Sequence, residues 1–127
     1  MAQSASPLEL SIVVPSFNER GNIAELVRRL SQSLEDIEWE LVIVDDDSPD
    51  STAALIRDIA VVDRRIRCLQ RIGRRGLSSA CIEGILNTAA PIIAVMDADL
   101  QHDETRLPAM LAAMRTQDAD IAIATRY

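Results

Sequence analysis

The chain is short and acidic, which limits what it can be. It has 127 residues, 48% of them hydrophobic, so it is long enough for one domain with a core. A formal net charge of −7 argues against nucleic acid as the main partner. All 13 basic residues are Arg and none is Lys. This absence matters because several classes of phosphate-handling site depend on a lysine.

The beginning of the chain and its hydropathy indicate a cytoplasmic protein. Residues 1–7 are small and mostly polar, and we expect a disordered leader without the basic and apolar regions of a signal peptide. No apolar run approaches the roughly 20 residues that span a membrane. We therefore expect cytoplasmic localisation, with residues 8–127 forming one domain.

The first half of the chain alternates between apolar runs and amphipathic stretches. Strands are predicted over residues 8–14, 40–44 and 66–70, the third near a sheet edge. Apolar residues recur at helical spacing after residue 22, and a second helix is predicted to follow Pro49. A loop over 71–76 is rich in Arg and Gly, and we expect most of the six arginines clustered over 64–75 to lie on a solvated edge.

The second half continues the alternation. A helix over 77–88 is rich in small residues, which suits close packing against another element. A strand over 92–96, a helix over 105–117 and a last strand over 120–124 follow. Strands that alternate with helices predict an α/β fold with a mostly parallel sheet.

Two carboxylates follow the predicted strand over 92–96, whose apolar run indicates burial on both faces. Asp is depleted in strands and costly to bury unpaired, so Asp97 and Asp99 need a cation or several hydrogen-bond donors. A hard divalent cation held by one or two carboxylates and substrate phosphates meets that need. The alternative is an acidic cap at a helix N-terminus. His102 is expected to hydrogen-bond locally rather than to bind metal.

Polar side chains also follow the first two predicted strands. Phe17 and Glu19 come after the first, and the acidic run 45–47 after the second. Carboxyl ends of parallel strands meet at one edge, where α/β sheets bind ligands. An acidic edge with one aromatic ring fits a nucleotide diphosphate bound through a metal. Turn and capping roles remain open for residues 45–47.

Other carboxylate-rich α/β folds fit less well. A phosphate receiver domain needs a lysine at a later strand end. Haloacid-dehalogenase-type phosphatases usually carry their Asp pair on the first strand, whereas Asp97 follows the fourth. The glycine-rich phosphate loop and the dinucleotide fingerprint are both missing, because residues 15–19 read P-S-F-N-E after the first strand. A metal-dependent nucleotide-sugar site remains.

Four motifs in order resemble family 2 glycosyltransferases with the GT-A fold: V-P-S-F-N-E at 14–19, V-D-D-D-S-P-D at 44–50, G-L-S-S-A at 76–80 and M-D-A-D-L-Q-H at 96–102. The D-D-D-S-P-D form and the closing T-R-Y look most like the dolichyl-phosphate or polyprenyl-phosphate mannosyltransferase branch. The resemblance implies a Rossmann-like three-layer sandwich. It also implies that residues 8–127 are the nucleotide-sugar-binding part of a GT-A domain, truncated at the C-terminus.

The resemblance assigns roles to named residues. Those expected to line the nucleobase and ribose pocket are Pro15, Phe17, Glu19, Val44 and Asp46. Those expected to hold Mg²⁺ or Mn²⁺ and the diphosphate are Asp97, Asp99 and Gln101. The two aspartates are also the implied catalytic residues. Ala98 would pass close to the sugar nucleotide, and Arg126 would approach the phosphates.

The implied reaction transfers mannose from GDP-mannose to a polyprenyl or dolichyl phosphate, with inversion, at the cytosolic face of a membrane. A UDP-sugar donor is the alternative within the family. A nucleotide-binding domain without turnover is the alternative for this stretch alone. Phe17 stands where the family usually has Tyr, and Asp103 stands where it often has Pro.

Overall fold

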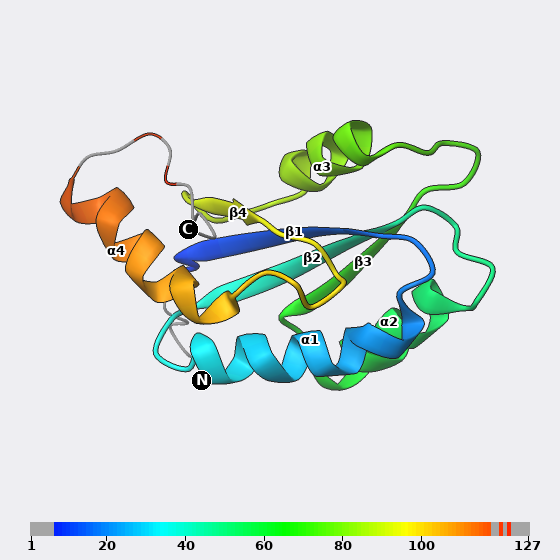
Figure 1. Cartoon of the computed structure of the whole chain (residues 1–127), viewed down its shortest axis with the longest axis horizontal. Coiled ribbons are helices and arrows are strands. Elements are labelled where there is room, and N and C mark those ends of the chain that lie inside the picture. The colour runs from blue at the N-terminus through cyan, green and yellow to red at the C-terminus, as the bar shows by residue number, and fades with distance from the viewer. Residues whose placement is uncertain (1–6, 118–119, 121, 123–127) are drawn as a thin grey trace, which may run out of the picture.

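The structure is a computed structural model that describes residues 7–117, 120 and 122 (Figure 1). All but the last residue of the expected leader, most of the strand expected over 120–124, and Arg126 lie outside the described residues. No helix of the described part is both long and apolar enough to cross a bilayer.

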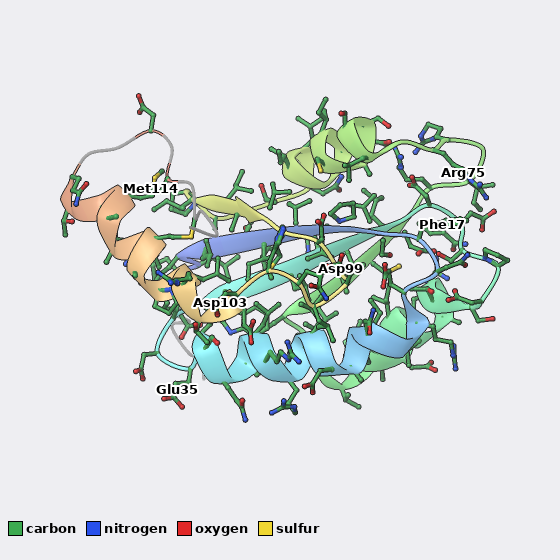
Figure 2. The ribbon with its side chains drawn as sticks, viewed as in Figure 1. Phe17, Glu35, Arg75, Asp99, Asp103 and Met114 are labelled. Atoms are coloured by element: carbon green, nitrogen blue, oxygen red, sulfur yellow. The ribbon has the colours of Figure 1, made fainter. Side chains whose placement is uncertain are left out.

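Strands and helices alternate along the described chain, as predicted (Figure 1; side chains in Figure 2). The elements are β1 (Leu10–Ser16), α1 (Arg20–Ser33), β2 (Trp39–Asp45), α2 (Thr52–Val62), β3 (Ile66–Gln70), α3 (Leu77–Leu86), β4 (Ile93–Val95), the 3₁₀ helix η1 (Glu104–Arg106) and α4 (Leu107–Thr116). The four strands are parallel and ordered β3-β2-β1-β4. The predicted α/β class with a parallel sheet is confirmed, and β3 lies at an edge of the described sheet.

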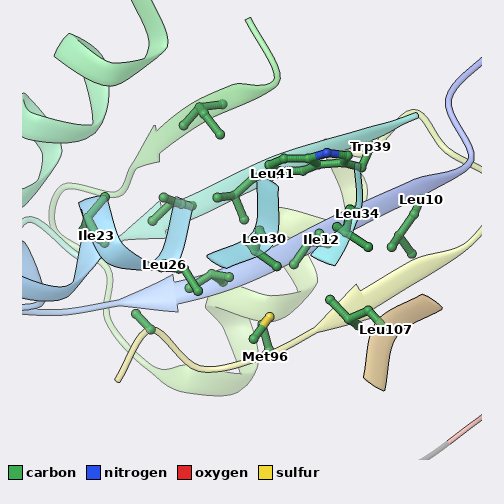
Figure 3. Packing of buried hydrophobic residues seen from close by; sticks show 14 of the residues in the cluster. Leu10, Ile12, Ile23, Leu26, Leu30, Leu34, Trp39, Leu41, Met96 and Leu107 are labelled. Carbon is green, nitrogen blue, oxygen red and sulfur yellow. The ribbon is translucent and has the colours of Figure 1, made fainter. Parts of the chain in front are cut away.

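Helices cover both faces of the sheet and make three layers, with α1 and α2 on one side and α3 on the other (Figure 1). Alternate strand residues point to opposite faces. Ile12 of β1 therefore joins the core beneath α1, and Val13 joins a smaller cluster beneath α3. The larger core includes Trp39 and the inward face of α1 (Figure 3). The expected three-layer sandwich is confirmed.

Helix α3 packs closely on the sheet because it carries a glycine at the contact. A Cβ at Gly84 would lie 2.9 Å from Cγ2 of Val44 and closer still to Val13. Any larger residue would push the helix away from β1 and β2. The expectation that small residues in this helix serve close packing is confirmed at this position.

Strand β4 differs from the expectation of burial on both faces. It has three residues and lies at the second edge of the described sheet. Ile93 is 38% exposed and Val95 49%. Their partners in β1 are Ser11 and Val13, so they share the face on which α3 packs. Since α3 covers β1 and β2, this face of β4 is left open in the described part of the chain.

Candidate functional site

The loops at the carboxyl ends of β1 and β2 are joined by hydrogen bonds. The backbone N–H of Asn18 donates to Oγ of Ser48 at 2.8 Å. That hydroxyl donates in turn to Oδ1 of Asp45 at 2.6 Å. The backbone N–H of Arg20 donates to Asp50. Because all strands are parallel, the loop after β4 leaves the sheet at the same edge. The predicted gathering of strand ends at one edge is confirmed.

Backbone strain is concentrated in these loops. Four non-glycine residues of the described chain have positive φ: Asn18 (55°), Asp47 (55°), Ser51 (67°) and Leu100 (65°). Asn and Asp tolerate this conformation, whereas it is unusual for a bulky residue such as Leu. Each of these residues lies in a loop that follows β1, β2 or β4. Strained backbone of this kind clusters at ligand-binding sites.

A cavity of about 280 Å³ opens beside the ends of β1 and β2. Its lining residues are Pro15, Ser16, Phe17, Asp46, Arg75, Gly76, Leu77 and Ala80. Its size is near the lower end of small-molecule pockets, which begin at roughly 300 Å³. The structure thus brings together three of the residues expected to contact the nucleoside, namely Pro15, Phe17 and Asp46.

Phe17 and Arg75 face each other at the cavity (Figure 2). The Phe17 residue is 40% exposed, and Cζ of Arg75 lies 4.5 Å from the ring centroid. A guanidinium over an aromatic face is attracted by the ring quadrupole. This face of the ring thus already carries one flat group, and a planar ligand that took its place would stack on the same face.

Asp46 is held by a buried arginine. Arg71 Nε donates to Asp46 Oδ1 at 2.6 Å, and Nη2 donates to Oδ2 at 2.8 Å. The same guanidinium donates to the carbonyl of Gly76, to Ser79 and to Glu83. The N–H of Gly76 donates back to Asp46 Oδ2 at 3.1 Å. This network joins the end of β2 to the loop before α3.

The network sets the charge state of Asp46. The hydrogen bonds from Arg71 are the main reason why the pKa of the Asp46 carboxyl lies below its ordinary value. The same contact raises the pKa of Arg71. The expectation that most arginines over 64–75 lie on a solvated edge is confirmed. Arg71 is the exception, because its side chain has no exposed surface. No local sequence pattern indicated this burial, because Asp46, the partner of Arg71, lies 25 residues earlier in the chain.

The two remaining residues expected in the nucleoside pocket do not line this cavity. Val44 is fully buried and packs with Ala80, which does line it. Glu19 immediately precedes α1 and accepts a hydrogen bond from Nδ2 of Asn22 at 2.7 Å. Glu19 is therefore at the expected edge of the sheet, but it takes part in local structure at the start of the helix.

Asp97 and Asp99 lie in the loop after β4, with both side chains exposed and Ala98 buried between them. The N–H of Asp97 donates to Nδ1 of His102 at 3.2 Å, which agrees with the local role expected for this histidine. Asp99 Oδ1 accepts the N–H of Gln101 at 3.1 Å. This turn directs two carboxylates outward from one short loop.

The donor set of this loop fits a hard divalent cation. Within the described residues no hydrogen bond engages Oδ2 of Asp99 or Oδ1 of Asp97, so each carboxylate keeps an oxygen for a ligand. Carboxylate and amide oxygens suit Mg²⁺ and Mn²⁺. Between residues 7 and 117, and at 120 and 122, no group of three or more His, Cys, Asp or Glu side chains could hold a metal by itself.

Comparison with known families matches residues 11–127 to the family described as "Glycosyl transferase family 2". A dolichol-phosphate mannosyltransferase of Pyrococcus furiosus is 37% identical over 120 residues, covering 94% of this chain and 34% of that protein. The chain spans 34 to 45% of the length of the curated relatives considered.

Two solved structures share the fold. A mannosyltransferase from Pyrobaculum calidifontis in complex with GDP-Man and Mn²⁺ has a TM-score of 0.68 at 22% identity, over 90% of this chain and 36% of that one. Glucosyl-3-phosphoglycerate synthase from Mycobacterium tuberculosis, with Mn²⁺ and uridine diphosphate, has a TM-score of 0.65 at 22% identity, over 86% and 40%. Both are similar in the order and packing of their elements, which confirms the expected GT-A fold.

Proposed function

We propose that this chain, which belongs to glycosyl transferase family 2, binds the nucleotide-sugar donor for sugar transfer to a polyprenyl phosphate. The favoured donor is GDP-mannose with Mn²⁺ or Mg²⁺. The observation that supports this most is the cavity lined by Phe17 and Asp46, at the sheet edge that also carries the loop of Asp97 and Asp99. One end of this edge suits a nucleoside and the other suits a metal-bound diphosphate.

Each part of the edge has a distinct task in this proposal. Phe17 offers a face on which the base stacks, and such stacking is worth about 1–3 kcal/mol per base in proteins that bind single-stranded nucleic acids. Asp97, Asp99 and Gln101 would hold the cation together with the diphosphate. The cation, when bound, supplies positive charge that stabilises the leaving diphosphate. The exposed position of the two aspartates leaves them accessible to the donor.

The acceptor is proposed from its chemistry and from the names of the relatives. Three of the curated relatives considered are named for dolichol phosphate. A lipid phosphate is already an anionic nucleophile, so the reaction does not require a protein base. Attack from the face opposite the leaving diphosphate would invert the anomeric carbon. A lipid acceptor implies work at a membrane surface, for which the cytosolic face is proposed, and Arg126 is proposed to approach the phosphates.

A UDP-sugar is the second candidate donor. It is favoured by the likeness to a synthase solved with uridine diphosphate and Mn²⁺. It uses the same stacking face and the same metal ligands, so only the contacts to the base edge distinguish it from GDP-mannose. The described stretch could also bind the donor without turning it over.

The proposal is tested with Asp97→Asn combined with Asp99→Asn. Because both side chains are exposed, the variant is expected to keep its circular dichroism and its unfolding midpoint. GDP binding in the presence of Mn²⁺, measured by calorimetry, is expected to weaken at least tenfold. Asp36→Asn combined with Asp58→Asn is the matched control, because it removes the same charge from two exposed sites elsewhere. Unchanged GDP affinity in the Asp97 and Asp99 variant would refute their assigned role.

A further inference from the structure

Three arginines lie in the loop between β3 and α3, and they differ in what their side chains contact. Arg71 is buried and commits its guanidinium to Asp46, Gly76, Ser79 and Glu83. Arg74 pairs with Glu83 at 2.8 Å. Arg75 makes no hydrogen bond or ion pair to any other residue within 7–117. Its N–H donors are available to a ligand.

Arg75 is placed where a bound base would lie. It lines the cavity together with Phe17 and Asp46, and its guanidinium covers the ring that a base would stack on. Its charge is close enough to Asp46 to contribute to the low pKa of that carboxyl. A base that stacks on this face of Phe17 takes the place of the guanidinium, and the freed donors then lie beside the base.

We infer that Arg75 selects guanine as the base of the nucleotide donor. A guanidinium presents two parallel N–H donors, and the O6 and N7 atoms of guanine are two adjacent acceptors that match them. Uracil has no such pair, because its N3–H donor separates O4 from O2. Adenine does not match the two donors either, because it presents a donor at N6 beside the acceptor N7. The inference rests on the proposed function and adds to it the residue that distinguishes GDP from UDP.

The geometry favours the base edge over the phosphates as the target of Arg75. Its neighbours at the cavity are the aromatic ring, Pro15, Leu77 and Ala80, which suit a flat, partly apolar group. The loop proposed to hold the cation and diphosphate is a different one, which follows β4. A contact to phosphate would affect all nucleoside diphosphates equally, which gives the experiment a clear alternative outcome.

The test compares GDP and UDP binding, each with Mn²⁺, by calorimetry on the 127-residue chain. Arg75→Leu is expected to weaken GDP binding about tenfold, as loss of a bidentate contact to guanine would, and to leave UDP binding within twofold. Arg74→Leu is the matched control, because it removes the same charge from the preceding residue, which does not line the cavity. It is expected to change neither affinity.

A second measurement changes the ligand instead of the protein. The 7-deaza analogue of GDP lacks the N7 acceptor, so it is expected to bind the unaltered chain several-fold more weakly than GDP does. The Arg75→Leu variant is expected to bind the two equally. Equal weakening of GDP and UDP in that variant would overturn the inference and identify a phosphate contact. Discrimination against the analogue that persists without Arg75 would also overturn it.

The binding results distinguish an error in the proposed function from an error in the role of Arg75. If the unaltered chain binds neither GDP nor UDP with Mn²⁺, the proposed function and the inference are both wrong. If it binds nucleotides in a metal-dependent way but its preference does not change with residue 75, only the inference is wrong. Because Arg75 is exposed, its substitution is expected to leave the fold intact, and circular dichroism checks this.

Discussion

Arg71 and Asp46 form a bidentate pair at the carboxyl end of the sheet, with N–O distances of 2.6 and 2.8 Å, although the arginine side chain is fully buried. The pair also fixes Gly76, whose N–H and carbonyl bond to Asp46 and Arg71 respectively. Two of these three residues line the cavity. The shape of the candidate base pocket therefore depends on a network built from β2 and the loop after β3.

Breaking this pair is expected to destabilise the fold. Asp46→Asn removes one of the two carboxylates that compensate the buried guanidinium of Arg71, the other being Glu83. Losing one partner of a buried pair costs about 3–5 kcal/mol. We expect the free energy of unfolding, measured with urea, to fall by about 3 kcal/mol. Asp47→Asn is the matched control, because it makes the same change at the next, exposed residue. Its positive φ of 55° also suits Asn. Equal losses in the two variants would contradict the importance of the buried pair.

The pair also predicts how stability depends on pH. The pKa of Asp46 is lower in the folded chain than its ordinary value, so the folded state favours the charged form. The stabilisation is present above about pH 4 and is lost as the pH falls through the folded pKa. Urea unfolding at pH 7, 5, 4 and 3 is expected to show a flat region and then a decline. Asp46→Asn should decline less steeply, and an identical slope would show that other carboxyls are responsible.

The contact of α3 with the sheet makes a separate prediction. Gly84→Ala places a methyl group against Val13 and Val44, and overpacking of this kind costs about 1–3 kcal/mol. Gly21→Ala is the control, because it lies in α1 with nothing within 4 Å of the added Cβ. That change is expected to leave stability unchanged or raise it by up to about 1 kcal/mol. Thermal unfolding of both variants checks the difference, and a neutral Gly84→Ala would mean that α3 can shift freely.

Phe17 is expected to contribute to nucleotide binding through its ring alone. Phe17→Ala should weaken the binding of both GDP and UDP, each by roughly fivefold or more, because every base has a flat face that can stack. Phe17→Tyr keeps the ring and should retain affinity. Fluorescence or calorimetric titration with both nucleotides measures this. A loss of affinity confined to one nucleotide would show that Phe17 contributes more to binding than a flat stacking surface.

Much of the fold could be predicted because the patterns that indicate its strands and helices lie within short stretches of the sequence. Each apolar run was short enough to be a strand, and the helix faces followed from spacing alone. The parallel order then required the strand ends to meet at one edge. The exposure of Ile93 and Val95 could not be predicted, because it depends on which neighbours cover β4 rather than on the strand itself.

The candidate site was predicted less completely than the fold. Pro15, Phe17 and Asp46 were placed in a common pocket by their motifs, and the cavity contains all three. The partner of Asp46 was missed, because an arginine 25 residues away gives no local signal that its side chain is buried. The position of Arg75 over Phe17 was missed for the same reason, since only the closed fold brings the two loops together.

Metal-dependent binding of GDP by the unaltered chain is the most direct test of the donor site. Calorimetry is performed with Mn²⁺ and again after its removal by a chelator. We expect saturable binding of GDP at a 1:1 ratio with Mn²⁺ and affinity at least tenfold weaker without it. Absence of binding to both GDP and UDP in the presence of Mn²⁺ would contradict the account.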